Sequence, residues 1–143
     1  MIAAAFLTSA MTVDNSLEVG KNAPKIETID GTNVVNDANF SKKTNFGKTT
    51  VVNFWNPKKP SSRIANKTLS RKYSENNENV QFISICTDAD DKLMNEVMKI
   101  DGVNPDINFS FSQISPRVFK DYDVENSPRT FVISPEGKIL EMI

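Results

Sequence analysis

The chain has 143 residues, a net charge of −1 and a hydrophobic content of 38%, values that are typical of one globular domain with its own core. It contains no histidine, which excludes the usual general base, the usual zinc ligand and every catalytic pair built on histidine. Its single cysteine, Cys86, excludes an intramolecular disulfide.

The first eleven residues, Met1–Met11, are mostly small and apolar, and Thr8-Ser9-Ala10 is an acceptable site for signal peptidase. The run is short for a signal peptide and lacks the basic residues that begin one. An export-signal remnant in residues 1–11 and an ordinary N-terminus both stay open, and residues 12–143 are predicted to form a single domain. No stretch approaches the ~20 apolar residues of a membrane-spanning helix.

Along the rest of the chain, apolar residues recur with the periods of strands and helices. The predicted strands are Lys25–Ile29, Thr32–Val35, Thr49–Trp55, Val80–Cys86, Thr130–Ile133 and Lys138–Met142, the last two joined by a tight turn. The predicted helices are Ser62–Asn76, a segment from Asp90 or Asp91 to Ile100, and Arg117–Tyr122. Ile107–Phe111 alternates apolar and polar residues and fits either a short strand or an extended loop.

The segment Thr49–Trp55 is the one around which the others are arranged. Its residues are β-branched or aromatic except for Asn53, which predicts a strand buried on both faces, as in a parallel sheet. Asn56-Pro57 ends the strand, and Ser61-Ser62 is predicted to cap the helix that follows. Free N–H groups at the start of this helix would then meet the carboxyl edge of the sheet. The helix is predicted to bury one stripe made of Ile64, Ala65, Thr68, Leu69, Lys72 and Tyr73.

Basic residues concentrate around this junction. Between Asp37 and Glu75 there are nine basic residues and no acidic one, whereas Glu75–Asp91 holds five acidic residues and no basic one. Two interpretations stay open: two solvated faces of opposite charge, and a cleft that binds an anion or an acidic group. The net charge of −1 and the lack of a recognised motif argue against nucleic acid as a partner.

The strand–helix junction resembles the thioredoxin-like family, in particular its secreted bacterial branch of the TlpA/ResA type. In that branch, a strand ending in Val-Asn-Phe-Trp is followed by Cys-Pro-Pro-Cys and by a basic residue that opens the helix. Val52-Asn53-Phe54-Trp55, Pro60 and Arg63 match this pattern, but Lys59 and Ser62 stand where the two cysteines would be. The resemblance therefore implies a redox site without its redox atoms.

Two further segments carry the same resemblance. Leu17–Pro24 looks like the VGxxAP entry of redoxins, and Thr130–Ile133 with its following turn looks like their last hairpin. The resemblance implies an α/β, thioredoxin-like fold with a central mixed sheet of about five strands, helices on both faces and a C-terminal β-hairpin. It also implies a cis peptide bond between Ser127 and Pro128. The family usually has a further helix after the hairpin, and this sequence stops at Ile143; that helix is expected either to be missing or to lie beyond a truncated end of the sequence.

The residues at this junction cannot carry out disulfide exchange. That reaction requires a thiolate at the helix start and a second cysteine to resolve the mixed disulfide. Neither Lys59 nor Ser62 supplies a thiol, and no histidine is present to activate the serine. Cys86 is interpreted as a small core residue, with a peripheral redox role as the alternative. No catalytic residue, cofactor or metal is expected.

The same residues favour binding. Two interpretations of the cations stay open. Lys59 projects into water, or Lys58, Lys59 and Arg63 join the helix N–H groups and Arg129, on the loop that faces the helix in this family, in a shallow anion site. Ser127 keeps its backbone groups for pairing with an extended peptide, whatever its side chain is. The full predicted binding set is Trp55, Lys58, Lys59, Pro60, Ser62, Arg63, Ser127, Pro128 and Arg129.

The predicted function is a non-catalytic peptide- or protein-binding module that has lost the redox cysteines of its family. Its expected partner is an extended, acidic peptide or protein. The alternative is an oxidoreductase-family protein with atypical redox activity through Cys86 or through a cysteine of a partner. The family habit implies a periplasmic or secreted location, and a cytoplasmic one stays open.

Overall fold

The computed structural model describes residues 16–35, 47–73 and 79–143, so residues 1–11 and the predicted helix end at Asn76 lie outside the described part. It contains a five-stranded mixed sheet in the order β3-β2-β1-β4-β5. The strands are β1 (Thr49–Trp55), β2 (Val80–Cys86), β3 (Asn108–Phe109), β4 (Thr130–Ile133) and β5 (Ile139–Met142). The helices are α3 (Pro60–Lys72), α4 (Asp91–Asp101) and α5 (Pro116–Asp121), with short 3-10 turns η1 (Pro105–Ile107) and η2 (Phe111–Gln113).

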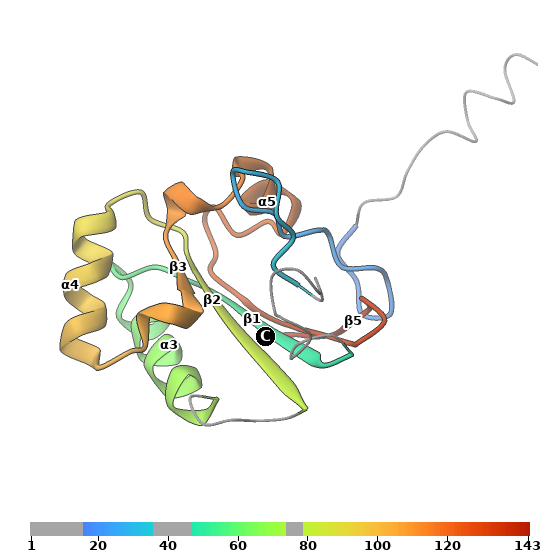
Figure 1. Ribbon diagram of the computed structural model, residues 1–143, viewed down its shortest axis with the longest axis horizontal. Coiled ribbons are helices and arrows are strands. Elements are labelled where there is room, and N and C mark those ends of the chain that lie inside the picture. Colours follow the sequence, from blue (N-terminus) through green and yellow to red (C-terminus); the bar gives the residue numbers. More distant parts are fainter. Residues whose placement is uncertain (1–15, 36–46, 74–78) are drawn as a thin grey trace, which may run out of the picture.

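Helices lie on both faces of the sheet, with α3 and α4 on one side and α5 on the other (Figure 1). β4 and β5 form an antiparallel hairpin at the C-terminal end of the described chain. The predicted α/β architecture, with its mixed sheet and C-terminal hairpin, is therefore confirmed.

β1 lies at the centre of the sheet, as its sequence predicts. It pairs in parallel with β2, where Val52 is opposite Ile83, and antiparallel with β4, where Val52 is opposite Phe131. Every residue of β1 except Thr49 is buried. β-Branched and aromatic side chains fit a pleated surface that is covered on both faces, whereas a buried Asn53 requires polar partners.

The face of the sheet beneath α5 is apolar. Phe54 of β1 contacts the rings of Phe119, Tyr122 and Phe131, with ring centroids between 5.1 and 6.4 Å apart. The hydroxyl of Tyr122 donates to the carbonyl of Pro24 and so ties the end of α5 to the N-terminal segment. Burial of these rings makes this side the main hydrophobic core of the domain.

The N-terminal segment covers part of this core without forming the two predicted strands. Within the described chain, residues 25–29 and 32–35 are joined by one isolated bridge, between Glu27 and Asn33, and by hydrogen bonds between Thr28 and Thr32. The turn at Asp30-Gly31 is present, but the ladder between the two arms is limited to this bridge, and Ile26 and Val34 are buried in the core. The turn chemistry was therefore predicted correctly and the strand length was not.

A second, smaller apolar cluster lies beneath α4, on the opposite face of the sheet. Trp55 and Cys86, the last residues of β1 and β2, are buried against Met94, Val97 and Val103. The cluster fixes α4 over the carboxyl ends of the two central strands. Helix α4 therefore borders the region where the sequence places the site.

The ends of α4 follow their sequence signals. Asp90 caps the helix by accepting a hydrogen bond from the backbone N–H of Leu93 at 3.0 Å. Gly102 ends it with a φ of 67°, a left-handed conformation that glycine adopts without steric cost. Ile100 is 73% exposed, so the prediction that it points into the core is wrong: it lies on the side of α4 away from the apolar cluster.

Helix α3 buries a polar face rather than the predicted apolar stripe. Ile64 is 65% exposed, and the buried residues of the helix are Asn66 and Ser70. The physical reason lies in the strands beneath, because β1 and β2 present Asn53 and Ser84 to this helix. The period of the helix was predicted correctly, but its inward face was not.

A buried hydrogen-bond network joins α3 to three strands. Oδ1 of Asn66 accepts from Nδ2 of Asn53 at 3.1 Å and from the hydroxyl of Ser84. Oδ1 of Asn53 in turn accepts from the hydroxyl of Thr130 in β4 at 2.9 Å. The network satisfies polar groups that would be costly to bury alone, and it attaches α3 by directional bonds.

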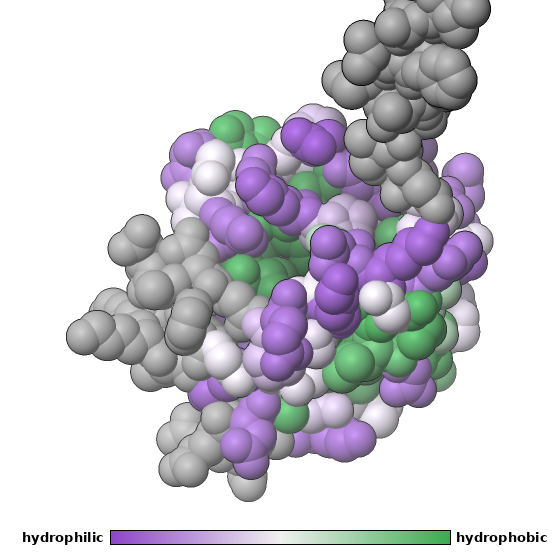
Figure 2. All heavy atoms as spheres, turned by 90° about the vertical axis from the view of Figure 1, so that its right-hand side faces the viewer, coloured by the Kyte–Doolittle hydropathy of each residue, from purple (hydrophilic) through white to green (hydrophobic). Residues whose placement is uncertain are grey.

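The surface is mixed in character. Hydrophilic side chains cover much of the face on the β5 side, and hydrophobic ones gather in smaller patches (Figure 2). Exposed apolar side chains include Leu140 and Ile143 at the C-terminal end. In the ranges that the structure describes, no helix is both long and apolar enough to cross a membrane.

We predict that Asn66→Ala lowers the free energy of unfolding by about 1–3 kcal/mol, because Asn53 and Ser84 lose their buried acceptor. Thr68→Ala is the matched control: Thr68 is exposed on the same helix, and threonine and asparagine have similar helix propensities. Urea denaturation of both variants measures the difference. Equal midpoints for the two variants would show that the network does not stabilise the fold.

Candidate functional site

The junction of β1 and α3 lies at the carboxyl end of β1. Helix α3 begins at Pro60, and the preceding Lys59 has an extended backbone with no side-chain hydrogen bond to the helix. The predicted cap at Ser61-Ser62 is wrong, because proline, with its fixed φ and no N–H, takes the first helical position. Oγ of Ser62 instead accepts from the backbone N–H of Asn56 at 2.8 Å, within the β1–α3 connection.

Lys59 connects the start of α3 to the loop before β4. Its Nζ donates to the carbonyl of Asn126 at 2.8 Å. The same loop is tied to β1, because the backbone N–H of Phe54 donates to the carbonyl of Arg129 at 2.9 Å. Between these two attachments, Ser127 is exposed. The structure therefore brings the helix start and the loop of the predicted site together.

The peptide bond between Ser127 and Pro128 is trans, since the described residues contain no cis peptide bond. The predicted cis bond is therefore wrong. For a bond to proline the trans isomer is favoured by about 0.5–1 kcal/mol, and no local feature of the sequence opposes this preference. The loop is held by its bonds to Lys59 and Phe54 with the peptide in the trans form.

Two of the predicted site cations form ion pairs with α4 and the loop before it. Nζ of Lys58 lies 3.1 Å from Oδ2 of Asp88, whose pKa is lowered first by the backbone N–H of Asp90 and then by Lys58. Arg63 donates from Nε and Nη2 to both carboxylate oxygens of Asp101, at 2.8 and 2.7 Å. These bonds hold the pKa of Asp101 below its usual value.

The basic side chains of the predicted site thus point to separate partners. Lys58 is directed to the loop before α4, Lys59 to the loop before β4 and Arg63 to the last residue of α4. The side chain of Arg129 has no hydrogen bond or ion pair within the described part of the chain. Because two of the four charges are neutralised by carboxylates, the positive charge left at the junction is that of Lys59 and Arg129.

Trp55 and Cys86 belong to the core beneath α4. Trp55 is 1% exposed, and its indole N–H finds no hydrogen-bond partner among the residues described. Cys86 is fully buried, and this burial raises the pKa of its thiol to about 12. A buried thiol with so little thiolate at neutral pH is a structural residue rather than a nucleophile.

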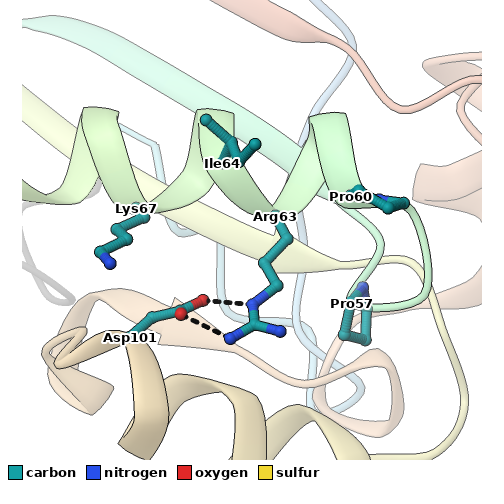
Figure 3. A pocket seen from close by; sticks show the side chains of 6 residues that line it. All are labelled: Pro57, Pro60, Arg63, Ile64, Lys67 and Asp101. Atoms are coloured by element: carbon teal, nitrogen blue, oxygen red, sulfur yellow. Dashed lines mark hydrogen bonds and ion pairs between the residues drawn. The ribbon is translucent and has the colours of Figure 1, made fainter.

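A hollow of about 350 Å³ lies beside the first turns of α3 (Figure 3). Its walls combine apolar side chains with one ion pair and one further cation. The lining residues are Pro57, Pro60, Arg63, Ile64, Lys67 and Asp101.

Of the predicted binding set, Pro60 and Arg63 line this hollow. Sequence reasoning missed the others, although Ile64 and Lys67 follow Pro60 at a spacing of four and seven residues and therefore share its helix face. That spacing was a usable signal, but Ile64 had been assigned to the core. Nothing in the sequence placed Asp101 here, because it belongs to another helix.

The junction offers hydrogen-bonding groups and charge but no activated nucleophile. Lys59 and Ser62, at the positions that match the cysteines of the family, are both engaged in hydrogen bonds within the protein. The described ranges also contain no group of three or more carboxylate and cysteine side chains placed to bind a metal. Such an arrangement is suited to holding a ligand.

We predict that Arg63→Gln lowers the melting temperature near neutral pH and that the loss shrinks in acid. The folded-state pKa of Asp101 is depressed, so this pair stabilises the fold above the unfolded pKa of about 3.9 and ceases to do so as the pH falls through the folded value. Thermal unfolding at a series of pH values from acidic to neutral measures the loss of melting temperature. Arg117→Gln is the control, since its pair with Asp121 is exposed and longer, at 3.4 Å. A pH-independent loss in Arg63→Gln would contradict the assignment.

We predict that Cys86 is inert in the native protein. A rise in pKa from 9.0 to about 12 lowers the thiolate fraction near pH 8 by roughly a thousandfold, and burial slows the reaction further. Labelling with a chromogenic disulfide reagent should be slow in buffer and stoichiometric in denaturant, and Cys86→Ser should not react at all. Rapid labelling of the native chain would contradict this prediction and indicate that Cys86 is a functional thiol.

Comparison with known proteins places this geometry in a family. The model of the Thioredoxin-like family matches residues 47–139. None of the curated proteins matches the chain in sequence. The structure is similar to that of a thioredoxin-like protein from Parabacteroides distasonis, with a TM-score of 0.71 and 25% identity over 89% of this chain and 88% of that one.

Two further solved structures share the fold. The thioredoxin domain of a thiol-disulfide oxidoreductase from Bacteroides vulgatus has a TM-score of 0.63 and 20% identity, covering 89% of each chain. A secreted disulfide oxidoreductase from Mycobacterium tuberculosis has a TM-score of 0.59 and 22% identity, covering 84% of this chain and 81% of that one. With a family match over more than half of its length and a single cysteine, this chain belongs to the thioredoxin-like family and lacks the cysteine pair of a disulfide-exchange site.

Proposed function

We propose that this protein is a binding module for an extended peptide or protein segment, built on a thioredoxin-like fold without its redox chemistry. The observation that carries the proposal is the state of the loop before β4. Ser127 is exposed at the carboxyl end of the sheet, and its backbone groups make no hydrogen bond within the described chain. Exposed backbone groups without partners are what strand-like peptide recognition uses, and Ser127 provides one N–H and one carbonyl.

The positions of the family cysteines support binding over reaction. Lys59 closes part of the space between helix and loop by its bond to Asn126, and Ser62 is used in the β1–α3 connection. A peptide that pairs with Ser127 would therefore lie against the loop and the aliphatic stem of Lys59. It would meet no group able to attack it.

The charge at the junction supports an acidic partner. Lys58 and Arg63 are neutralised by Asp88 and Asp101, but Lys59 bonds to an uncharged carbonyl and the side chain of Arg129 is unpaired in the part described. Lys59 bonds to the residue before Ser127, and Arg129 lies two residues after Ser127 along the chain. A carboxylate on the peptide would be attracted by Lys59 and Arg129 without displacing an existing ion pair.

We also infer that residues 12–143 act as one exported domain, in the periplasm or outside the cell. Support comes from the similarity to a secreted disulfide oxidoreductase and to other bacterial members of the family. Residues 1–11, which carry the predicted export-signal remnant, lie outside the described ranges. The inference therefore depends on the family likeness.

The alternative function, disulfide chemistry through Cys86 or a partner cysteine, has less support. Cys86 is fully buried under α4, and its raised pKa leaves little thiolate at neutral pH. Catalysis through a partner cysteine would still need an accessible thiol on this chain to exchange with it. No described residue at the junction supplies one.

We predict that Ser127→Pro weakens peptide binding roughly two- to tenfold, because it removes one backbone N–H donor. Ser127→Ala, which keeps the backbone and loses only the hydroxyl, should bind like the wild type. A peptide enriched from a display library on the wild-type chain is the probe, and calorimetric titration of the three proteins gives the affinities. Circular dichroism checks that each variant is folded.

The proposal fails on either of two results. Peptides that bind Ser127→Pro as tightly as the wild type would show that the loop is not part of the binding surface. A library that yields no binding peptide for the wild-type chain would remove peptide recognition altogether.

A further inference from the structure

The hollow beside α3 differs in character from the loop at Ser127. It opens on the other flank of the helix, toward α4, and none of the loop residues 126–129 lines it. Its volume of about 350 Å³ lies at the small end of the range for ligand pockets and is suited to one side chain or a fragment of similar size. It is therefore a separate candidate subsite.

One part of the hollow is apolar. Pro57 is buried beneath it, Pro60 forms the start of the helix and Ile64 stands at its edge with 65% of its surface exposed. Neither proline has an N–H to offer, so this wall cannot donate hydrogen bonds. An aliphatic or aromatic group placed here would cover an exposed isoleucine that nothing in the described chain covers.

The other part is cationic. Arg63 reaches from α3 to Asp101 of α4, and Lys67 extends on the same side of the helix (Figure 3). Arg63 and Asp101 neutralise each other, whereas Lys67 has no hydrogen bond or ion pair of its own among the described residues. The hollow therefore carries a net charge of about +1, since Lys67 is its uncompensated cation.

Arg63 retains capacity for a ligand. A guanidinium has five N–H donors, and the pair with Asp101 uses one on Nε and one on Nη2. Nη1 makes no hydrogen bond within the described chain, and Asp101 holds the planar group in place as a wall of the hollow. A carboxylate could therefore accept from Arg63 while it lies near Lys67, with the Arg63–Asp101 pair left intact.

We propose that this hollow binds a hydrophobic residue together with an adjacent carboxylate, as found at the C-terminus of a polypeptide or where an acidic residue follows a hydrophobic one. The apolar wall takes the side chain, and Arg63 and Lys67 take the anion. The inference rests on the proposed function in one respect, that the ligand is a polypeptide. It adds the class of residue that the partner must present.

The test uses small probes that separate the two requirements. N-acetyl-leucine has the side chain and the carboxylate, N-acetyl-leucinamide has only the side chain, and acetate has only the carboxylate. Nuclear magnetic resonance titration of the full ¹⁵N-labelled chain with each probe reports the site and the affinity. We expect saturable shifts at Arg63, Ile64 and Lys67 with N-acetyl-leucine, with a dissociation constant on the order of 1 mM or weaker. The other two probes should bind more weakly.

Variants identify the groups responsible. Lys67→Gln should weaken N-acetyl-leucine roughly two- to fivefold, as expected for an exposed ion pair, and leave N-acetyl-leucinamide unchanged. Lys92→Gln removes the same charge from an exposed position in the first turn of α4 and should have no effect. A fourth probe, N-acetyl-leucyl-glutamate with an amidated C-terminus, tests whether a side-chain carboxylate replaces the terminal one.

Two results would overturn the inference: equal binding of N-acetyl-leucine and its amide, or shifts that map away from the hollow. Ser127→Pro distinguishes these failures from failure of the proposed function. That variant should bind N-acetyl-leucine like the wild type, because Ser127 is not part of the hollow. Failure of one proposal can therefore be distinguished from failure of the other.

Discussion

The amide of Asn66 is the contact on which the geometry of the site depends. It is a buried polar group on α3 that accepts hydrogen bonds from both central strands, through Asn53 and Ser84. Hydrogen bonds are directional, so the network fixes both the rotation of the helix and its position along the sheet. The directions in which Lys59 and Arg63 leave the helix follow from that rotation. An apolar interface of the same area would have fixed them less strictly.

The electrostatics of the junction follow from the same placement. A cation at a helix N-terminus opposes the helix dipole, which makes Lys59 unfavourable unless its charge is directed elsewhere. Its bond to the carbonyl of Asn126 does this and joins the helix to the loop before β4. Lys58 and Arg63 are neutralised in the other direction, toward α4. At the position of the family's redox site, the side chains of this protein therefore form hydrogen bonds and ion pairs within the chain, beside an exposed loop.

The sequence was sufficient for the framework and insufficient for the interfaces. β1, β2 and the hairpin were predicted because dense apolar runs and turn residues are local signals, and the family resemblance ordered them. The inward face of α3 was not, because an apolar stripe and a polar stripe share one period, and the choice depends on Asn53 and Ser84 in separate strands. The same limit applies to Asp101, which meets Arg63 across 38 residues of chain.

The backbone positions of the site residues were predicted, but the partners of their side chains were not. The resemblance correctly indicated that the start of α3 and the loop before β4 are neighbours. It also carried over a cis proline that this chain does not have, since the described residues contain no cis peptide bond and trans is the favoured isomer of a bond to proline. A family resemblance predicts the course of the backbone more reliably than it predicts the isomer of one peptide bond.

The polar underside of α3 has a thermodynamic consequence for how the domain can open. Apolar surface exposed on unfolding dominates the heat-capacity change, and the described core places that surface mainly beneath α5 and α4. Release of α3 would expose Asn66 and Ser70 of the helix, together with Val51 and Phe82, which are buried on the sheet face that carries Asn53 and Ser84. The heat-capacity change for opening α3 alone would be smaller than that for global unfolding, because the clusters beneath α5 and α4 would stay buried.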